Sequence, residues 1–337
     1  MRGIVTRADT DGFTVRAGHE IYRCGSRGKV KRNGTIAVGD CVEFSLNAHG
    51  GVIESIEKRK SLLLRPRVAN ADLILAVVSP VPRPDLYTLD KILVNAERSD
   101  IPVAIVANKS DEDAGLFAAL KEEYSGTVSE ILSFSAKTGE GKKELLSLLR
   151  GKFAVLAGNS AAGKTSVVNA VLGLNLKTGD CSEKIMRGKQ TTAYSEIFFG
   201  EADCGEESEV NSGEAGCGEK NGGESRNNSG EETFTDNLRQ NGERMAGVSE
   251  NKNEIMLADT PGFAAIDIDI VADELKDYYP EFVSAAGGCK FRGCTHTAEP
   301  FCAVKALVEE GKIPRGRYER YLNIYKELKE RRTGYER

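Results

Sequence analysis

The sequence lacks a long apolar segment. None of its 337 residues belongs to an apolar run of about eighteen residues, the length that a membrane-spanning helix needs. The first residues also lack the apolar stretch of a secretory signal, because the chain turns polar after Arg7. These absences argue against the membrane-spanning and secreted classes. We expect a cytoplasmic protein without a membrane partner, and a monomer.

Cysteine and histidine are few, and their spacing is uneven. Five of the eight cysteines are scattered singly, which disfavours a disulfide framework. Cys289, Cys294, His296 and Cys302 instead form the pattern C-x4-C-x-H-x5-C. Three thiolates and one imidazole match a closed, tetrahedral structural zinc site. We predict one Zn²⁺ per chain, with an iron–sulfur cluster as the alternative that the pattern leaves open.

Large apolar side chains are almost missing between residues 201 and 252. This segment holds 13 acidic and 5 basic residues, a net charge of −8, against −5 for the whole chain. The remainder of the protein is therefore positively charged. Because the segment cannot bury enough apolar surface to offset the entropy of ordering, we predict a disordered acidic insert.

The first part of the chain, residues 1–66, has the pattern of a small β-barrel. Short alternating strands, as at 12–16 and 40–44, are separated by Gly-rich turns, which favours an OB-fold. Basic residues are frequent in it, so we expect an RNA- or ribosome-binding domain, with a solvated loop face as the alternative that the charges alone leave open. They are Arg23, Arg27, Lys29, Lys31, Arg32, Lys58, Arg59, Lys60 and Arg65, and Arg67 follows directly after this part.

Residues 67–264 change to continuous apolar strands that alternate with helical segments. The strands at 73–78, 103–107 and 153–157 and the amphipathic stretches at 86–97 and 115–124 predict a doubly wound α/β domain with a parallel sheet. Residues 265–337 predict a helical zinc-binding domain. Its expected helices span 272–282 and 315–332.

A phosphate-binding loop lies between the strand at 153–157 and a helical run. Its sequence matches G-x4-G-K-[ST], and this strand–loop–helix context is the one that the motif requires. Backbone N–H groups would surround the phosphates, Lys164 would reach the β- and γ-oxygens, and Thr165 would bind Mg²⁺. The predicted GTP-binding residues here are Gly158, Asn159, Ser160, Ala161, Ala162, Gly163, Lys164, Thr165 and Ser166.

Two further loops indicate that the base is guanine. Asn108, Lys109 and Asp111 form the N-K-x-D pattern directly after an apolar strand. The Asp111 carboxylate can accept from both guanine donors, N1–H and the exocyclic amine, which adenine lacks as a pair. This argues against a P-loop ATPase. Ser135, Ala136 and Lys137 fit the companion loop, in which the Ala136 N–H meets the guanine O6.

Two switch segments complete the expected site. Asp259-Thr260-Pro261-Gly262 follows an apolar strand, so Asp259 would hold Mg²⁺ through water and the Gly262 N–H would contact the γ-phosphate. In the segment 188–192, Thr191 or Thr192 would complete the Mg²⁺ shell. We expect Lys164 and Gly262 to take part in catalysis, together with Gln190.

The order of these motifs is circularly permuted. In ordinary small GTPases the phosphate loop precedes the base-specificity loop, whereas here N-K-x-D and S-A-K come first. The same sheet can close if the usual termini are joined and the chain is opened elsewhere. One consequence is that the switch at Asp259 leads directly into the Cys/His region.

With these motifs the sequence closely resembles the RsgA (YjeQ) family of ribosome small subunit biogenesis GTPases. The resemblance implies an OB-fold, a permuted GTPase domain and a zinc-binding domain, with GTP hydrolysis stimulated by the small ribosomal subunit during late maturation and coupled to release. It extends over nearly the whole chain outside 201–252. It is carried by the motifs above and by residues 61–66, 277–282, 289–291, 299–300, 302–305 and 318–322.

Three features depart from the family pattern. Ala161 and Ala162 stand where the family usually has Gly and Val, Gln190 replaces a histidine of the first switch, and the acidic insert is additional. A second hypothesis is an RNA-binding, nucleotide-sensing module with little hydrolysis. The basic residues of the last helix suit RNA binding in either case; they are Arg315, Arg317, Arg320, Lys326, Arg331 and Arg332.

Overall fold

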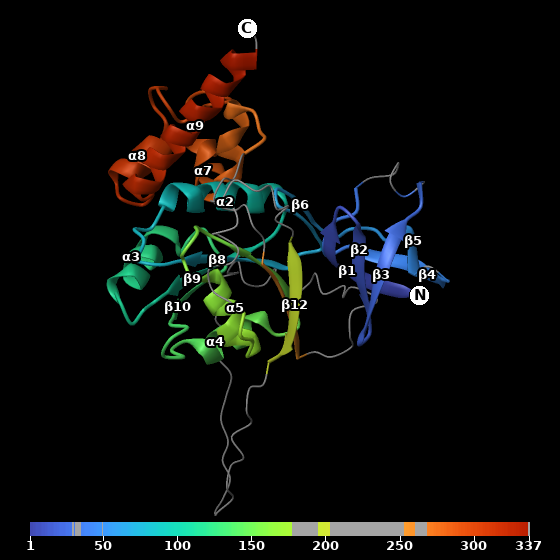
Figure 1. Ribbon diagram of the computed structural model, residues 1–337. Helices are drawn as coiled ribbons and strands as arrows, with labels where there is room; N and C mark the ends of the chain where they lie inside the picture. Colours follow the sequence, from blue (N-terminus) through green and yellow to red (C-terminus); the bar gives the residue numbers. More distant parts are fainter. Residues whose placement is uncertain are drawn as a thin grey trace, which may run out of the picture. The chain divides into compact units, whose positions relative to one another are not determined.

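The computed structural model describes residues 1–28, 30, 35–48, 50–176, 195–202, 253–259 and 268–335, and for 332–335 only the backbone. Its first five strands form a closed barrel (Figure 1). The strand order β1-β2-β3-β5-β4 closes through β1–β4, and β3 and β5 are parallel. This is the Greek-key arrangement of an OB-fold, as predicted. The strands are β1 (Arg2–Asp9), β2 (Gly12–Ala17), β3 (Glu20–Ser26), β4 (Cys41–Asn47) and β5 (Gly50–Ile56).

The barrel core consists of inward-facing residues from these strands. Val5, Val15, Val42 and Ile53 have no exposed surface, and Phe44 is almost completely buried. A two-stranded hairpin, β6 (Leu62–Leu64) and β7 (Arg67–Ala69), follows the barrel.

The second sheet segment has the order β10-β9-β8-β11-β13-β12, in which only β12 is antiparallel to its neighbour. Helices cover both of its faces, with α2 and α3 on one side and α4 and α5 on the other (Figure 1). This confirms the expected doubly wound α/β fold. The strands are β8 (Leu73–Val78), β9 (Val103–Asn108), β10 (Glu130–Phe134), β11 (Phe153–Ala157), β12 (Glu196–Glu201) and β13 (Glu254–Asp259), and the helices are α2 (Leu86–Arg98), α3 (Gly115–Tyr124), α4 (Lys142–Leu149) and α5 (Lys164–Leu172).

Barrel and α/β sheet are continuous, which the sequence did not indicate. Strand β1 pairs antiparallel with the edge strand β12 at Arg7 and Glu196, so one sheet holds eleven strands. Arg16 of β2 strengthens this junction. Its guanidinium lies 2.9 Å from the Glu254 carboxylate and 3.8 Å from the centre of the Phe199 ring.

The last region is helical around an aromatic core. Leu275, Tyr279, Phe282 and Tyr321 are fully buried there. The helix expected at 272–282 is two elements, because Tyr279 is extended and Pro280 begins a new helix, where its missing N–H costs nothing. The elements are η3 (Ala272–Tyr278), α7 (Pro280–Ala285), η4 (Ala286–Gly288), α8 (Ala303–Glu309) and α9 (Arg315–Tyr335). Across the described part of the chain, no helix has the length and apolar character needed to cross a membrane.

Candidate functional site

The phosphate-binding loop joins the end of β11 to the start of α5. Gly158 and Gly163 both have positive φ angles, 128° and 92°. A Cβ atom at Gly158 would overlap the Val77 carbonyl oxygen, and one at Gly163 would overlap the Asn108 side chain. Glycine is therefore required at both positions. Because α5 begins at Lys164, its unpaired N–H groups face the loop, as an anion site requires.

Two side chains of this loop have unusual positions. The Lys164 ammonium donates to the carbonyl oxygens of Gly158 at 2.9 Å and Asn159 at 2.8 Å, so it lies over the loop that would hold the phosphates. Ala161 has a φ of 66° although it carries a Cβ. Such a left-handed conformation costs on the order of 1–2 kcal/mol in a non-glycine residue. The family's glycine would relieve this strain.

The proposed guanine loops contact the phosphate loop and each other. The buried Asn108 amide donates to the Ala162 carbonyl at 2.9 Å. Asp111 accepts from the Ser135 hydroxyl at 2.7 Å, and the Lys137 ammonium lies 3.5 Å from its other oxygen. The hydrogen bond from Ser135 holds the pKa of Asp111 below its usual value, so this carboxylate is ionised at neutral pH.

The same edge of the sheet holds the remaining parts of these loops. Ala136 packs partly buried against the core, and the Thr138 N–H donates to the Ser135 hydroxyl at 3.1 Å, which fixes the S-A-K turn. Lys109 reaches across to the Val81 carbonyl at 2.5 Å. Asn108, Asp111, Ser135 and the phosphate loop are thus brought together from β9, β10 and β11.

Only one of the predicted switch residues lies in the described part of the chain. Asp259 is the last residue of β13 and pairs in register with Leu156 of β11, two residues before Gly158. It therefore stands beside the phosphate loop. Gln190, Thr191 and Thr192 fall within 177–194 and Gly262 within 260–267, both outside the described residues.

The four predicted metal ligands converge. The ligand atoms of Cys289, Cys294, His296 and Cys302 all lie within 4.8 Å of one another. His296 Nδ1 is 3.3 Å from the Cys302 sulfur and 3.6 Å from that of Cys289, and these two sulfurs are 4.0 Å apart. In a tetrahedral zinc site with bonds of about 2.3 Å, ligand atoms are roughly 3.8 Å apart. The donor set and its spacing therefore fit Zn²⁺.

A second layer of hydrogen bonds holds the loop that carries His296. The Tyr318 hydroxyl donates to the His296 carbonyl at 2.8 Å. Glu299 accepts from the Thr295 N–H at 2.6 Å, the Thr295 hydroxyl at 2.7 Å and the Thr297 N–H at 2.9 Å. Burial opposes ionisation of Glu299, but these hydrogen bonds prevail and lower its pKa to about 2. A donor set of four protein side chains is that of a structural rather than a catalytic zinc site.

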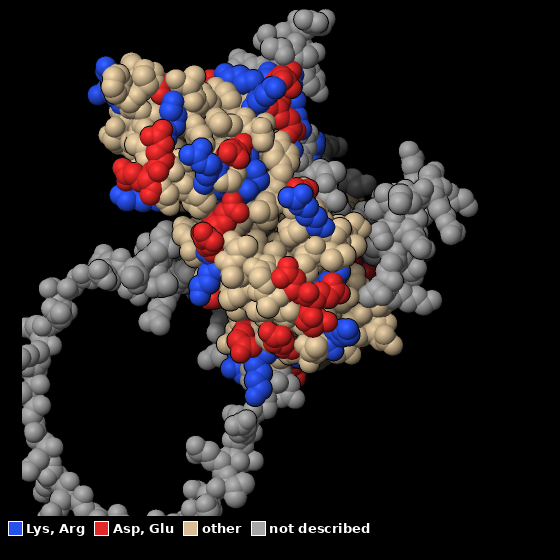
Figure 2. Space-filling view, turned by 90° about the vertical axis from the view of Figure 1, so that its left-hand side faces the viewer, with Lys and Arg blue, Asp and Glu red and all other residues tan. Residues whose placement is uncertain are grey.

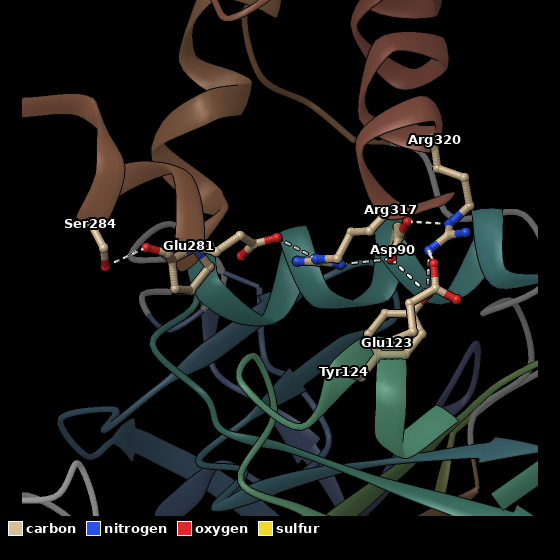
Figure 3. A network of polar contacts seen from close by, with 8 residues as sticks. Asp90, Glu123, Tyr124, Glu281, Ser284, Arg317 and Arg320 are labelled. Atoms are coloured by element: carbon tan, nitrogen blue, oxygen red, sulfur yellow. Dashed lines mark hydrogen bonds and ion pairs between the residues drawn. The ribbon is translucent and has the colours of Figure 1, made fainter. Parts of the chain in front are cut away.

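A buried network of charges joins the α/β domain to the last helix (Figure 3). Asp90 of α2 is fully buried and binds Arg317 of α9 at 2.7 Å and Arg320 at 2.5 Å. Arg317 also pairs with Glu281, and Arg320 binds Glu123 of α3 at 2.6 Å. The sequence offered no signal for this network, because its members lie up to 230 residues apart.

The network corrects the expectation that Arg317 and Arg320 suit RNA binding. The Arg317 side chain is 1% exposed and that of Arg320 15%, and both are used by carboxylates inside the protein. Several basic residues of the barrel are also paired internally. Arg23 pairs with Asp9, Arg27 with Glu54, Arg59 with Asp40 and Lys60 with Asp72. On the face shown in Figure 2, acidic and basic side chains are interspersed.

These features define the class of the protein. The two companion loops precede the phosphate loop in the chain, and the α/β sheet has a single antiparallel strand at its edge. This arrangement is that of a circularly permuted GTPase. The family model described as RsgA GTPase matches residues 56–204. The sequence is 35% identical to the small ribosomal subunit biogenesis GTPase RsgA of Thermotoga maritima, over 98% of both chains. It is 34% identical to the RsgA of a Geobacillus species, over 99% of both.

Solved structures agree with this result. The crystal structure of YjeQ from Thermotoga maritima superposes with a TM-score of 0.69 at 33% identity, covering 97% of this chain and 98% of that one. YloQ, described as a circularly permuted GTPase, gives 0.63 at 25% identity, covering 98% and 95%. The chain belongs to the RsgA (YjeQ) family of small ribosomal subunit biogenesis GTPases.

Proposed function

We propose that this GTPase binds the small ribosomal subunit and its rRNA, and couples GTP hydrolysis to late subunit maturation and to its own release as the GDP form. The hydrogen bond between Asn108 and Ala162 carries the nucleotide part of the proposal, because it ties the guanine loop to the phosphate loop in one site. The relatives in Thermotoga maritima and Geobacillus are small ribosomal subunit biogenesis GTPases, which supports the ribosomal part.

In this proposal the phosphate loop binds the nucleotide through its backbone N–H groups and through Lys164. Asp111 selects guanine by accepting from two donors, and the Ala136 N–H meets O6. Thr165 would hold Mg²⁺ directly and Asp259 through water, and Thr191 or Thr192 would complete the shell. Mg²⁺ would neutralise charge that develops on the phosphates. Zn²⁺ would be held by the three cysteines and His296.

Turnover measurements test the proposal. GTP hydrolysis by the full chain is measured with Mg²⁺, alone and with purified small subunits, and ATP serves as the competing substrate. We expect subunits to raise GTP turnover by more than tenfold, with ATP hydrolysed far more slowly. Large subunits, which share the chemistry of rRNA, are the matched control. Equal stimulation of turnover by small and large subunits, or no stimulation by either, would contradict the ribosomal part of the proposal.

The nucleotide-sensing module without appreciable hydrolysis is the competing function. It predicts tight binding of GTP and small subunits but no stimulated turnover. The same experiment, combined with sedimentation of the protein with subunits, separates the two.

A further inference from the structure

Two exposed phenylalanines flank a lysine beside the Cys/His cluster. Phe301 is 74% exposed and Phe291 44%, although both are large apolar side chains. The Lys290 ammonium lies 4.6 Å from the centre of the Phe301 ring and 5.8 Å from that of Phe291. An ammonium between two solvent-exposed rings is an arrangement that the fold does not need for packing.

The backbone holds this arrangement in place. The Lys290 N–H donates to the Phe301 carbonyl at 3.2 Å, so the two residues are tied together. Phe301 has a φ of 57°, a left-handed conformation that is strained for a non-glycine residue. Lys290 follows the ligand Cys289, and Phe301 precedes the ligand Cys302. Metal binding would therefore rigidify the surface that presents both rings.

An open hollow of about 470 Å³ lies next to these residues. That is within the range of roughly 300–1,000 Å³ that is typical of small-ligand sites. Val283 and Phe291 supply apolar surface to it, and the predicted metal ligands Cys289, Cys294 and His296 also belong to its lining. Its charged lining consists of Lys276, Lys290, Arg292 and a single carboxylate, Asp277.

The charges around the hollow favour an anion. Within the described residues, no carboxylate forms an ion pair with Lys290 or Arg292. The nearby Glu299 carboxylate is engaged by the N–H and hydroxyl groups of its own loop. Exposed aromatic rings next to uncompensated cations are the features by which proteins bind single-stranded nucleic acid, with bases stacked on the rings and phosphates near the cations.

We propose that this surface, formed by Phe291, Phe301, Lys290, Arg292 and the adjacent hollow, binds an unpaired nucleotide of RNA. The base stacks on an exposed phenyl ring, and its phosphate is bound by Lys290 and Arg292. The inference deepens the proposed function, because rRNA of the small subunit is the RNA that it would contact.

The test measures binding of the full-length, zinc-loaded protein to two probes. One is a short fluorescein-labelled single-stranded RNA, followed by anisotropy, and the other is purified small subunits with a non-hydrolysable GTP analogue, followed by sedimentation. Phe301→Ala should weaken binding to both about tenfold, because one stacked base contributes on the order of 1–3 kcal/mol. Phe301→Tyr should bind like the parent.

Lys290→Gln gives an independent readout, the salt dependence. One lost phosphate contact should lower the slope of log K against log salt by about 0.7 for single-stranded RNA, whereas Phe301→Ala should leave the slope unchanged. Phe117 and Lys121 of α3 provide matched controls, since the Lys121 ammonium lies 5.9 Å from the Phe117 ring centre. Phe117→Ala and Lys121→Gln should bind both probes like the parent.

The outcomes distinguish this inference from the proposed function. If the parent does not bind small subunits, the proposed function fails, and the RNA probe still decides the inference. If the parent binds but Phe301→Ala and Lys290→Gln bind equally well with full zinc content, the inference is overturned. A photoreactive benzoylphenylalanine at position 301 that crosslinks to a ribosomal protein rather than to rRNA would also overturn it.

Discussion

At the scale of single residues, the proposed selection of guanine depends on how Asp111 is held. Its carboxylate accepts from the Ser135 hydroxyl through one oxygen and lies near the Lys137 ammonium through the other. A carboxylate fixed and ionised in this way is ready to accept from two adjacent N–H donors. The N-K-x-D motif predicts the residue, and the folded loops supply its orientation.

We predict that Asp111→Asn loses GTP binding and gains affinity for xanthosine triphosphate, whose base has a carbonyl in place of the exocyclic donor. Replacing an acceptor by an amide donor reverses the hydrogen-bond requirement at that position. Binding of both nucleotides is measured by fluorescence titration. Ser110→Ala, in the same loop, is the control and should retain GTP preference, because the Ser110 hydroxyl donates to Glu140. Unchanged GTP affinity in Asp111→Asn would exclude the assignment.

The attacking water raises a second question at this scale. Phe263 follows the Asp-x-x-Gly switch, and a phenyl ring cannot orient water. His19 and His49 belong to the barrel segment of the sequence, and His296 belongs to the Cys/His cluster. No histidine therefore occupies the position in the first switch where the family usually has one. Gln190 stands there instead, and its amide can both donate and accept.

We predict that Gln190→Ala lowers subunit-stimulated turnover by on the order of 10² and leaves GTP affinity nearly unchanged, as expected of a contact made in the transition state. Gln190→His should retain activity. Single-turnover hydrolysis on small subunits is the measurement. Parental turnover in the alanine variant would mean that rRNA or a backbone group positions the water.

At the scale of elements, helix α2 connects the phosphate loop with the last helix. Its N-cap Asp85 accepts from the Thr88 N–H at 3.1 Å. Burial opposes ionisation of Asp85, but hydrogen bonds from Thr88 and from the Asn159 side chain of the phosphate loop lower its pKa. Further along, Lys91 pairs with Glu327 of α9 at 2.8 Å, and Asp90 binds Arg317. One rigid helix therefore contacts both regions.

We predict that Asp90→Ala lowers the free energy of unfolding by about 3–5 kcal/mol, because it removes the fully buried carboxylate that Arg317 and Arg320 share and leaves Arg317 with Glu281 alone. Chemical denaturation monitored by circular dichroism measures the change. Glu310→Ala removes the acidic member of an exposed pair with Lys312 and serves as the control, with an expected effect within experimental error. A small effect of Asp90→Ala would show that water replaces the lost carboxylate as the hydrogen-bond partner of the Arg317 guanidinium.

The metal centre is a second element whose stability can be tested. We predict one Zn²⁺ per chain by elemental analysis, and loss of zinc in Cys302→Ser together with unfolding of the C-terminal region. Metal binding contributes ~10 kcal/mol to the folding of small zinc domains. Cys24→Ser changes a buried cysteine of the barrel and should keep the zinc. A folded C-terminal region in zinc-free protein would refute the site.

At the scale of the whole molecule, the long acidic segment interrupts a single hairpin. Strands β12 and β13 pair from Glu196–Asp259 to Glu201–Glu254, and the Ala202 N–H donates to the Asn253 carbonyl at 2.8 Å. Glu201, which the sequence places in the insert, is thus the last residue of β12. Residues 203–252 are outside the described part of the chain.

We predict that deleting residues 203–250 and joining the ends with an Asn-Gly turn leaves basal GTP hydrolysis within about threefold, because the hairpin partners are already adjacent and no transition-state contact is removed. Initial rates at saturating GTP are the measurement. As a control, a scrambled insert of the same composition should behave like the parent. A much larger loss on deletion would show that the segment shapes the adjacent switch.

The sequence alone determined the class of fold, the permuted motif order and the four residues of the Cys/His cluster. Each of these depends on local patterns: apolar runs that form buried strands, glycines where a Cβ would collide, and donors spaced within one short loop. The tertiary structure decided what depends on distant partners. It pairs β1 with β12 into one sheet, and it buries Arg317 and Arg320 against Asp90. A sequence pattern does not encode such contacts. The same arginine stands in the sequence whether its side chain faces solvent or a carboxylate 227 residues away.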